Sequence, residues 1–174
     1  MKKLCLFLML FSFAATIHAA EKKETSPYTE EEKAAQAKQV ELMLSNPKIG
    51  KQFIPISKSN EDNKAGYAYL DKDSIKLHPY NQRIRVFREV INYVPELVQN
   101  IDNIKTPYHA IAINYYANCA KKEIAKGQLD LVENFFAEGK MINHINIPSR
   151  WIRARKGDDK HQLLVIACSL PLNK

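Results

Sequence analysis

Glycine is scarce in this sequence: the five glycines are scattered through 174 residues and form no cluster. A phosphate-binding loop needs several glycines close together, because its backbone must approach the ligand closely. The sequence therefore contains no such loop, and it also lacks a nucleophile elbow and a free cysteine beside a base. Acid–base pairs that converge from distant segments leave no local motif. These absences thus favour a binding or structural protein over an enzyme, and we predict no catalytic residues.

Metal-ligand patterns are lacking as well. The four histidines beyond residue 20 stand in separate segments, at His78, His109, His144 and His161. None belongs to a His-Glu-x-x-His spacing, and no cysteine or carboxylate ligand pair accompanies them. We therefore expect scattered surface or turn histidines, with His109 packed in a sheet, and neither a metal site nor a cofactor.

Residues 1–20 have the three parts of a secretory signal peptide. Lys2 and Lys3 are basic, an apolar run begins at Leu4, and small residues end it at Ala19 and Ala20. The alternative is an uncleaved membrane anchor, but the run is short for a span, which needs about 20 apolar residues, and it contains polar side chains. We predict cleavage after Ala19 or Ala20, and no transmembrane segment in the mature chain. The mature protein would lie in the periplasm, on the cell surface or outside the cell.

Cysteine is also rare, with three in the whole chain. Cys5 lies within the predicted signal peptide and too near its start to be a lipid-attachment site, which would follow the apolar run. Its removal leaves Cys119 and Cys168 in an oxidising compartment. An even pair in an exported chain favours a disulfide over a metal site or a catalytic thiol.

Positive charge exceeds negative charge. The formal net charge is +7, and loss of Lys2 and Lys3 with the signal peptide leaves +5. This balance favours acidic partners such as anionic glycans, lipopolysaccharide or acidic protein surfaces. Export argues against nucleic acid as a partner.

Residues 21–50 are predicted to form a charged helical arm or linker. Thr29 followed by Glu30 to Glu32 is a capping-box start, with acidic side chains against the positive end of the helix dipole. The helix should end near Ser45 to Pro47. Its apolar face is thin until Leu42 to Leu44, so we expect it to dock only by those residues. A coiled coil is disfavoured because no heptad is sustained.

Residues 51–174 are predicted to form a single α+β domain in which an antiparallel sheet precedes a helix. Polar loops are expected at 57–64 and 95–106, and turns at 78–81 and 138–140. The alternation of one strand slips at Phe87, which indicates either a bulge or a second buried face. The predicted strands cover residues 53–56, 66–71, 83–93, 108–119, 129–137, 141–147 and 151–154.

The C-terminal segment is ambiguous. His161, Leu164, Val165 and Cys168 have helical spacing, but residues 163–167 are equally consistent with a strand. Asp158 suits an N-cap, and acidic residues suit the first turn of a helix. We therefore prefer a helix, which would bring Cys168 over the sheet.

A run of basic residues around Trp151 is the most suggestive binding feature. The alternative, to which we give about equal weight, is that these charges are solvated sheet-edge residues that discourage aggregation. If a disulfide brings residues near 119 and 168 together, Lys121 and Lys122 would join Lys160 in the same patch. The candidate binding residues are Arg150, Trp151, Arg153, Arg155, Lys156, Lys160, Lys121 and Lys122.

The order of several segments resembles the surface-adhesin protein E family of Gram-negative bacteria. The likeness spans about residues 64–170 and rests on the segments 69–75, 83–93 and 108–119, on Phe135-Phe136, Gly139 and Trp151, and on residues 163–168.

The resemblance implies a twisted antiparallel sheet with a C-terminal helix tied to it by a Cys119–Cys168 disulfide. It also implies a non-catalytic cell-surface protein whose relatives bind vitronectin, laminin and plasminogen, and which forms homodimers in some members. Two features depart from the family: no lipid-anchor cysteine stands at the predicted cleavage site, and a charged N-terminal arm is added. A periplasmic accessory or envelope-structural role is therefore the alternative.

Overall fold

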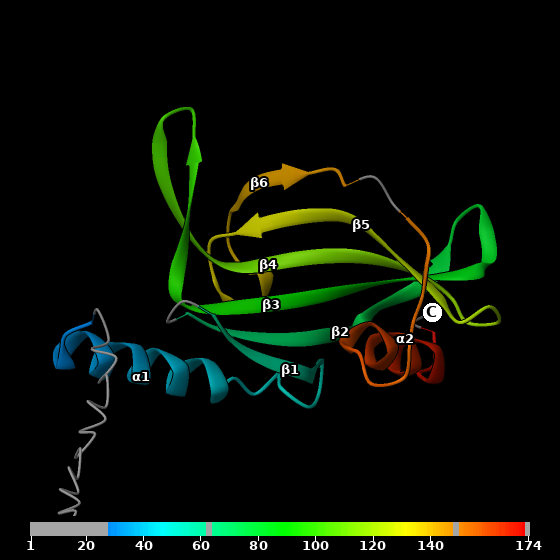
Figure 1. Ribbon diagram of the computed structural model, residues 1–174, viewed down its shortest axis with the longest axis horizontal. Helices are drawn as coiled ribbons and strands as arrows, with labels where there is room; N and C mark the ends of the chain where they lie inside the picture. The colour runs from blue at the N-terminus through cyan, green and yellow to red at the C-terminus, as the bar shows by residue number, and fades with distance from the viewer. Residues whose placement is uncertain (1–27, 62–63, 148–149, 173–174) are drawn as a thin grey trace, which may run out of the picture.

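The computed structural model describes residues 28–172 except 62–63 and 148–149. The predicted signal peptide, residues 1–20, lies outside this part of the chain. The described chain forms one curled antiparallel sheet with helices on both faces (Figure 1). Its strands are β1 (Phe53–Glu61), β2 (Lys64–His78), β3 (Asn81–Ile101), β4 (Ile104–Asn118), β5 (Glu123–Val132), β6 (Met141–Ile145) and β7 (Ile152–Arg153). The helices are α1 (Glu30–Leu44), the 3₁₀ helix η1 (Phe135–Ala137) and α2 (Asp159–Ser169).

The strands follow one another across the sheet in chain order, from β1 to β6, and β7 pairs with the other end of β5. Each strand from β1 to β6 is therefore hydrogen-bonded to its neighbour in sequence, an arrangement that short connections allow only for antiparallel strands. This architecture confirms the predicted α+β class with a C-terminal helix on a twisted sheet.

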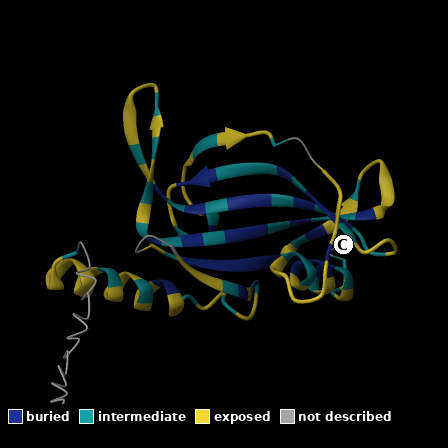
Figure 2. Ribbon diagram, in the orientation of Figure 1, coloured by how far each residue is buried: buried dark blue, intermediate teal, exposed yellow. Residues whose placement is uncertain are grey.

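Both faces of the sheet are partly covered. On one face Leu163 and Leu164 of α2 pack in a cluster with Phe87 and Tyr115. On the other face Phe136 of η1 joins a second cluster that also contains Met43 of α1. The buried stripes therefore run through the central strands, as Figure 2 shows.

The slip at Phe87 is explained by the second buried face, since β3 buries Phe87 in one cluster and Val90 in the other. The neighbouring irregularity lies in β2, whose pairing jumps from Asp71 opposite Arg88 to Lys76 opposite Val86. The ladder between β3 and β4 is unbroken from Ile84 to Asn92.

Two predicted loops are wrong because strand pairing continues through them. β1 runs on to Glu61, and residues 95–106 form the outer part of the long β3–β4 hairpin, paired from Leu97 opposite Tyr108 to Ile101 opposite Ile104. The two turn residues, Asp102 and Asn103, have φ of 49° and 66°, which Asp and Asn tolerate better than most residues. The outer hairpin projects from the sheet (Figure 1), so polar side chains and the apolar Val98 and Ile104 all face solvent, and the alternation that marks a half-buried strand is lost.

The strand predicted at 129–137 is shifted. β5 begins at Glu123 and ends at Val132, and the chain then turns through η1. Gly127 lies inside the strand because an added Cβ would meet the Tyr116 ring at 2.7 Å, so this glycine permits a close approach and does not end the strand.

Helix α1 begins as predicted. The Thr29 hydroxyl accepts a hydrogen bond from the Glu32 backbone N–H at 3.2 Å, and the Glu32 carboxylate accepts one from the Thr29 N–H at 2.7 Å. The bonds that the Glu32 carboxylate accepts, from the Thr29 backbone N–H and from the Thr29 hydroxyl, lower the pKa of Glu32. The docking prediction is wrong for two residues: Leu42 and Leu44 are 64% and 49% exposed, whereas Met43 is 2% exposed. One face of a helix continues at the third residue, and Val40 therefore packs with Met43.

Met43→Ala is expected to lower the free energy of unfolding by about 2 kcal/mol, because it removes a buried side chain that joins α1 to the sheet. Urea denaturation measures this loss, and limited proteolysis should cut α1 sooner. Leu42→Ala is the matched control, since that side chain is already exposed. Equal effects of the two variants would show that α1 is not held by Met43.

Helix α2 settles the ambiguity at the C-terminus. The Asp158 carboxylate accepts a hydrogen bond from the His161 N–H at 2.6 Å, and the helix buries Leu163, Leu164 and Ala167. The Cys119–Cys168 disulfide joins the end of α2 to the chain just beyond β4, with 5.8 Å between the two Cα atoms. The predicted helix and disulfide are confirmed.

Candidate binding surface

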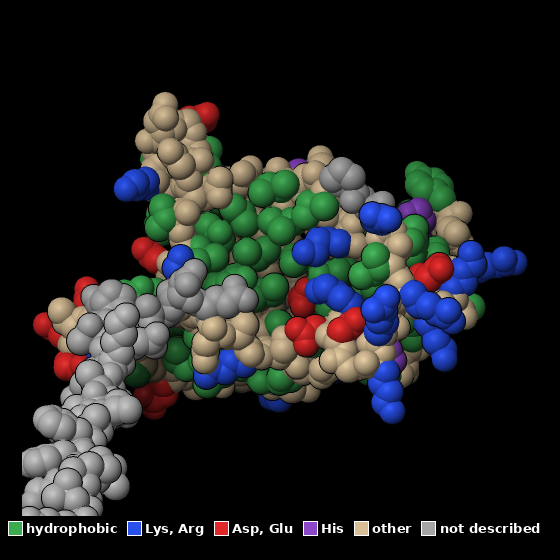
Figure 3. Space-filling model, viewed as in Figure 1, with side chains coloured by type: hydrophobic (Ala, Val, Ile, Leu, Met, Phe, Trp, Pro, Cys, Tyr) green, Lys and Arg blue, Asp and Glu red, His purple; other side chains and the backbone are tan. Residues whose placement is uncertain are grey.

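Six exposed cations gather at the end of the molecule that carries α2. They come from the β4–β5 connection and from the segment around β7, which antiparallel pairing places side by side: Glu123 lies opposite Arg153, and the Ala154 N–H donates to the Lys122 carbonyl at 3.1 Å. Figure 3 shows Lys and Arg side chains clustered at this end. We call this set the basic surface, and it consists of Lys121, Lys122, Arg150, Arg153, Arg155 and Lys156.

The charges of the basic surface are unpaired within the part of the chain that the structure describes. None of the six side chains lies in an ion pair with a described acidic residue. Asp158, the acidic residue that follows Arg155 and Lys156, uses its carboxylate to cap α2 and to accept the Arg155 backbone N–H. Solvated cations of this kind can attract an acidic partner over about a Debye length.

Trp151 stands between these cations in sequence. It is 43% exposed, and its neighbour Ile152 is 47% exposed. Tryptophan and arginine are enriched at protein interfaces, where the aromatic ring supplies contact area. The predicted candidates Trp151 and Arg150 thus lie on the same surface segment as the other cations.

Lys160 is placed differently from the other candidates. Its Nζ donates to the Tyr115 hydroxyl at 2.8 Å, lies 3.7 Å from Glu89 Oε2 and stands 4.9 Å from the centre of the Tyr115 ring. The side chain therefore points into the sheet beneath α2, and Lys160 does not belong to the basic surface. The pairing of β7 with β5 brings Lys121 and Lys122 beside the other cations. The sequence had instead predicted that the disulfide would bring them there.

Glu89 and Tyr115 were missed as partners of Lys160. Glu89 is 3% exposed and Tyr115 1% exposed, on the face that α2 covers. Burial raises the pKa of Tyr115, and the nearby Glu89 carboxylate raises it further. The signal in the sequence that could have revealed this contact is Glu89. It is a charged residue on the same strand face as the apolar residues Phe87 and Ile91, where a buried charge needs a partner.

The raised pKa of Tyr115 predicts a loss of stability in alkali. An unfolded tyrosine ionises near pH 10, whereas the folded Tyr115 stays protonated, so its contribution is intact below about pH 10 and is lost as the pH rises further. The denaturant midpoint should therefore fall above that pH. Tyr115→Phe should flatten this dependence, while Tyr80→Phe, at a 93% exposed site, should leave it unchanged; equal alkaline losses in both variants would contradict the assignment.

His109 and His144 each contact their own neighbouring side chains and share none that the structure describes. The His109 ring lies 4.4 Å from the Phe135 ring, and His144 Nδ1 is 2.7 Å from Asp130 Oδ1. Among the described residues, no group of three His, Cys, Asp or Glu side chains is arranged to hold a metal ion. Within the same residues, no helix combines the length and apolar character needed to cross a membrane.

A family model described as surface-adhesin protein E matches residues 53–169. The chain belongs to this family. The match begins with β1 and ends with the last residue of α2, so it covers the whole sheet and the disulfide, while α1 lies outside it.

Solved structures of Haemophilus influenzae protein E are similar in fold. One is 17% identical in sequence with a TM-score of 0.57, and the match covers 70% of this chain and 86% of that chain. A second crystal form is 18% identical with a TM-score of 0.51, covering 59% and 80% of the two chains. Protein E from a non-typeable strain is 16% identical with a TM-score of 0.56, covering 70% and 78%. No curated protein sequence matches the chain.

Proposed function

We propose that this protein is an exported, non-catalytic surface adhesin whose basic surface binds host matrix or plasma proteins, of the kind represented by vitronectin, laminin and plasminogen, or anionic glycans. Membership of the surface-adhesin protein E family supports the adhesin role. The observation that carries the choice of surface is the pairing of β7 with β5, which brings Lys122 beside Ala154. Two cationic segments distant in sequence thereby become one surface.

The charge of this surface sets how binding should behave. Unpaired exposed cations attract acidic groups over distance, and salt screens that attraction. The flanking Trp151, 43% exposed, supplies apolar contact that salt does not weaken. Binding should therefore weaken with salt without vanishing entirely.

The experiment uses the mature protein, residues 21–174, purified with its disulfide intact. Binding to immobilised vitronectin, laminin, plasminogen and heparin is measured over a salt series. We expect saturable binding to at least one of them, with an affinity that falls as salt rises. Absence of saturable binding to all four at low salt would overturn the proposal. Light scattering of the same sample tests whether the protein forms the homodimer that the family resemblance implies.

A further inference from the structure

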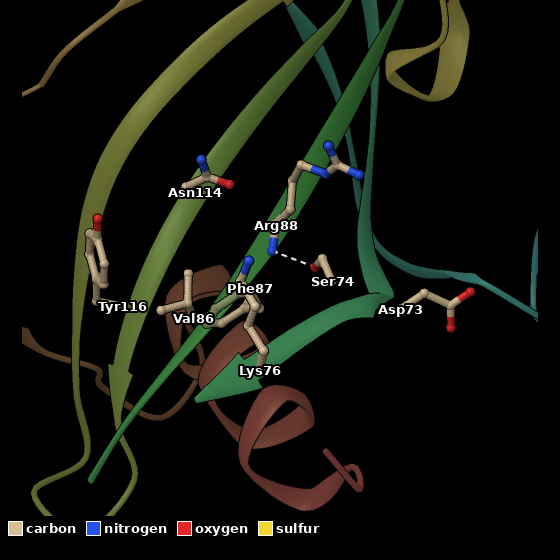
Figure 4. A pocket seen from close by; sticks show the side chains of 8 residues that line it. All are labelled: Asp73, Ser74, Lys76, Val86, Phe87, Arg88, Asn114 and Tyr116. Carbon is tan, nitrogen blue, oxygen red and sulfur yellow. Dashed lines mark hydrogen bonds between the residues drawn. The ribbon is translucent and has the colours of Figure 1, made fainter. Parts of the chain in front are cut away.

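A cleft of about 330 Å³ lies on the sheet face opposite α2, among β2, β3 and β4. Figure 4 shows Lys76, Arg88, Asn114 and Tyr116 around it, one or two from each of three adjacent strands, with α2 behind the sheet. None of these residues belongs to the basic surface. The cleft is thus a separate feature of the molecule.

The cleft exists because β2 leaves the regular ladder beside β3. Pairing jumps from Asp71 opposite Arg88 to Lys76 opposite Val86, so the residues between them bulge away from β3. The Arg88 backbone N–H is satisfied by the Ser74 hydroxyl at 2.8 Å, as the dashed line in Figure 4 marks. The Ser74 hydroxyl thus replaces the backbone carbonyl that a regular β2 strand would supply, and the displaced backbone leaves the cleft open.

Polar groups around the cleft have hydrogen-bonding capacity that the protein does not use. The Arg88 guanidinium is held by Asp71, which is 1% exposed, through a 2.8 Å bond from Nη2 to Oδ2. Arg88 Nε is nonetheless buried without a partner. The side chains of Lys76, Asn114 and Tyr116 make no hydrogen bond to any residue in the described chain. The Arg88 side chain as a whole is 41% exposed, so its other donors can meet an acceptor from a ligand in the cleft.

The Tyr116 ring is fixed in position. The His78 ring lies 5.8 Å from it, and Gly127 lets it lie against β5, since a Cβ at that position would come within 2.7 Å of the ring. The cleft therefore has a positioned aromatic ring beside its hydrogen-bond donors.

The charges narrow the class of ligand. Asp71 balances the charge of Arg88, which leaves Lys76 to attract an anion, while the Asn114 amide can bond to hydroxyl groups. A fitting ligand carries a carboxylate, several hydroxyls and a ring face that can lie on an aromatic ring. The cleft volume is within the range of small-molecule sites, roughly 300–1,000 Å³.

We infer that this cleft binds an acidic sugar unit, with its carboxylate at Lys76 and Arg88, a hydroxyl at Asn114, and its ring near Tyr116. This inference goes beyond the proposed function, because it rests on different residues and does not require binding of host proteins. It assigns to the family domain a second, small-molecule recognition site.

The test titrates the mature protein with glucuronate and N-acetylneuraminate by calorimetry and by NMR, with glucose as the neutral sugar and acetate as the carboxylate without a sugar. We expect saturable binding of at least one acidic sugar, at least about tenfold tighter than that of glucose or acetate. Resonances of Arg88 Nε–H and the Asn114 amide should shift. Lys76→Gln should weaken this binding about tenfold, whereas Lys105→Gln, an exposed lysine on the outer hairpin, should leave it unchanged.

Three results would overturn the inference: no saturable binding of either acidic sugar, equal binding of glucose, or unchanged affinity in both Lys76→Gln and Tyr116→Leu, which removes the aromatic ring. A fourth variant separates the two sites. If reversing Arg153, Arg155 and Lys156 abolished sugar binding, the sugar would lie on the basic surface and the cleft assignment would be wrong. Retained sugar binding in that variant supports the cleft whatever happens to host-protein binding.

Discussion

Reversing three charges of the basic surface, with Arg153→Glu, Arg155→Glu and Lys156→Glu together, is expected to weaken binding to the recognised host protein or to heparin by about a hundredfold. The variant changes six exposed positive charges into three of each sign. An acidic partner then meets like charges where it met opposite ones, and such juxtaposition costs several kcal/mol. None of the three side chains lies in an ion pair with a described residue, so folding should be little affected.

A matched control separates local recognition from net charge. Lys51→Glu, Lys64→Glu and Lys105→Glu change the net charge by the same amount at exposed positions outside the basic surface. The affinities of both variants and of the original protein are compared by surface plasmon resonance at one salt concentration. Equal losses in the two variants would show that the protein binds by overall charge, which contradicts a defined surface.

Removing the disulfide is expected to produce the largest loss of stability. In Cys119→Ser with Cys168→Ser the link across 49 residues is lost. The chain-entropy model for a loop of that length gives about 4 kcal/mol, a large part of the net stability of an ordinary domain. Helix α2 would then be held by its packing on the sheet, by Lys160 Nζ bonded to the Tyr115 hydroxyl, and by Arg85 Nη1, which donates to the Ala167 carbonyl at 2.8 Å.

Urea denaturation of the oxidised protein, the reduced protein and the double variant measures this effect. The reduced protein and the double variant should unfold at the same lower midpoint. A difference below about 1 kcal/mol between them and the oxidised protein would contradict a structural disulfide of this strength. Equal electrophoretic mobility with and without reductant would contradict the bond itself.

Features set by neighbouring residues were predictable from the sequence. Thr29 and Glu32 form the expected capping box, and Asp158 caps α2, because the partners in each cap are three residues apart. The cysteine pair was predictable for a different reason: exclusion of Cys5 with the predicted signal peptide left only one pairing.

Features that depend on pairing partners were not predictable in the same way. The outer β3–β4 hairpin buries neither side and exposes apolar residues such as Val98 and Ile104, so its sequence lacks the apolar–polar alternation of a half-buried strand. The strand predicted from residue 129 begins earlier, at Glu123. Gly127 lies inside this strand, where the Tyr116 ring leaves no room for a side chain. Neither feature has a local signal, because each is created by a strand that lies elsewhere in the chain.

The candidate site likewise contains features that were predictable from the sequence and one that was not. The cations around β7 were found because charge is visible in sequence, and their exposure is as expected. The inward turn of Lys160 was not found, since it depends on Tyr115 and Glu89, more than forty residues earlier in the chain. Spacing places Lys160 on a helix but does not say which side of that helix faces the sheet.

The most direct test of the account is whether the protein is displayed on the cell surface. Intact cells that express it are treated with a protease, and the protein is then followed by immunoblot, with a known periplasmic protein as the control for membrane integrity. A surface adhesin should be degraded while the periplasmic control is protected. Protection of both until the outer membrane is permeabilised would contradict surface display and favour a periplasmic accessory or envelope role.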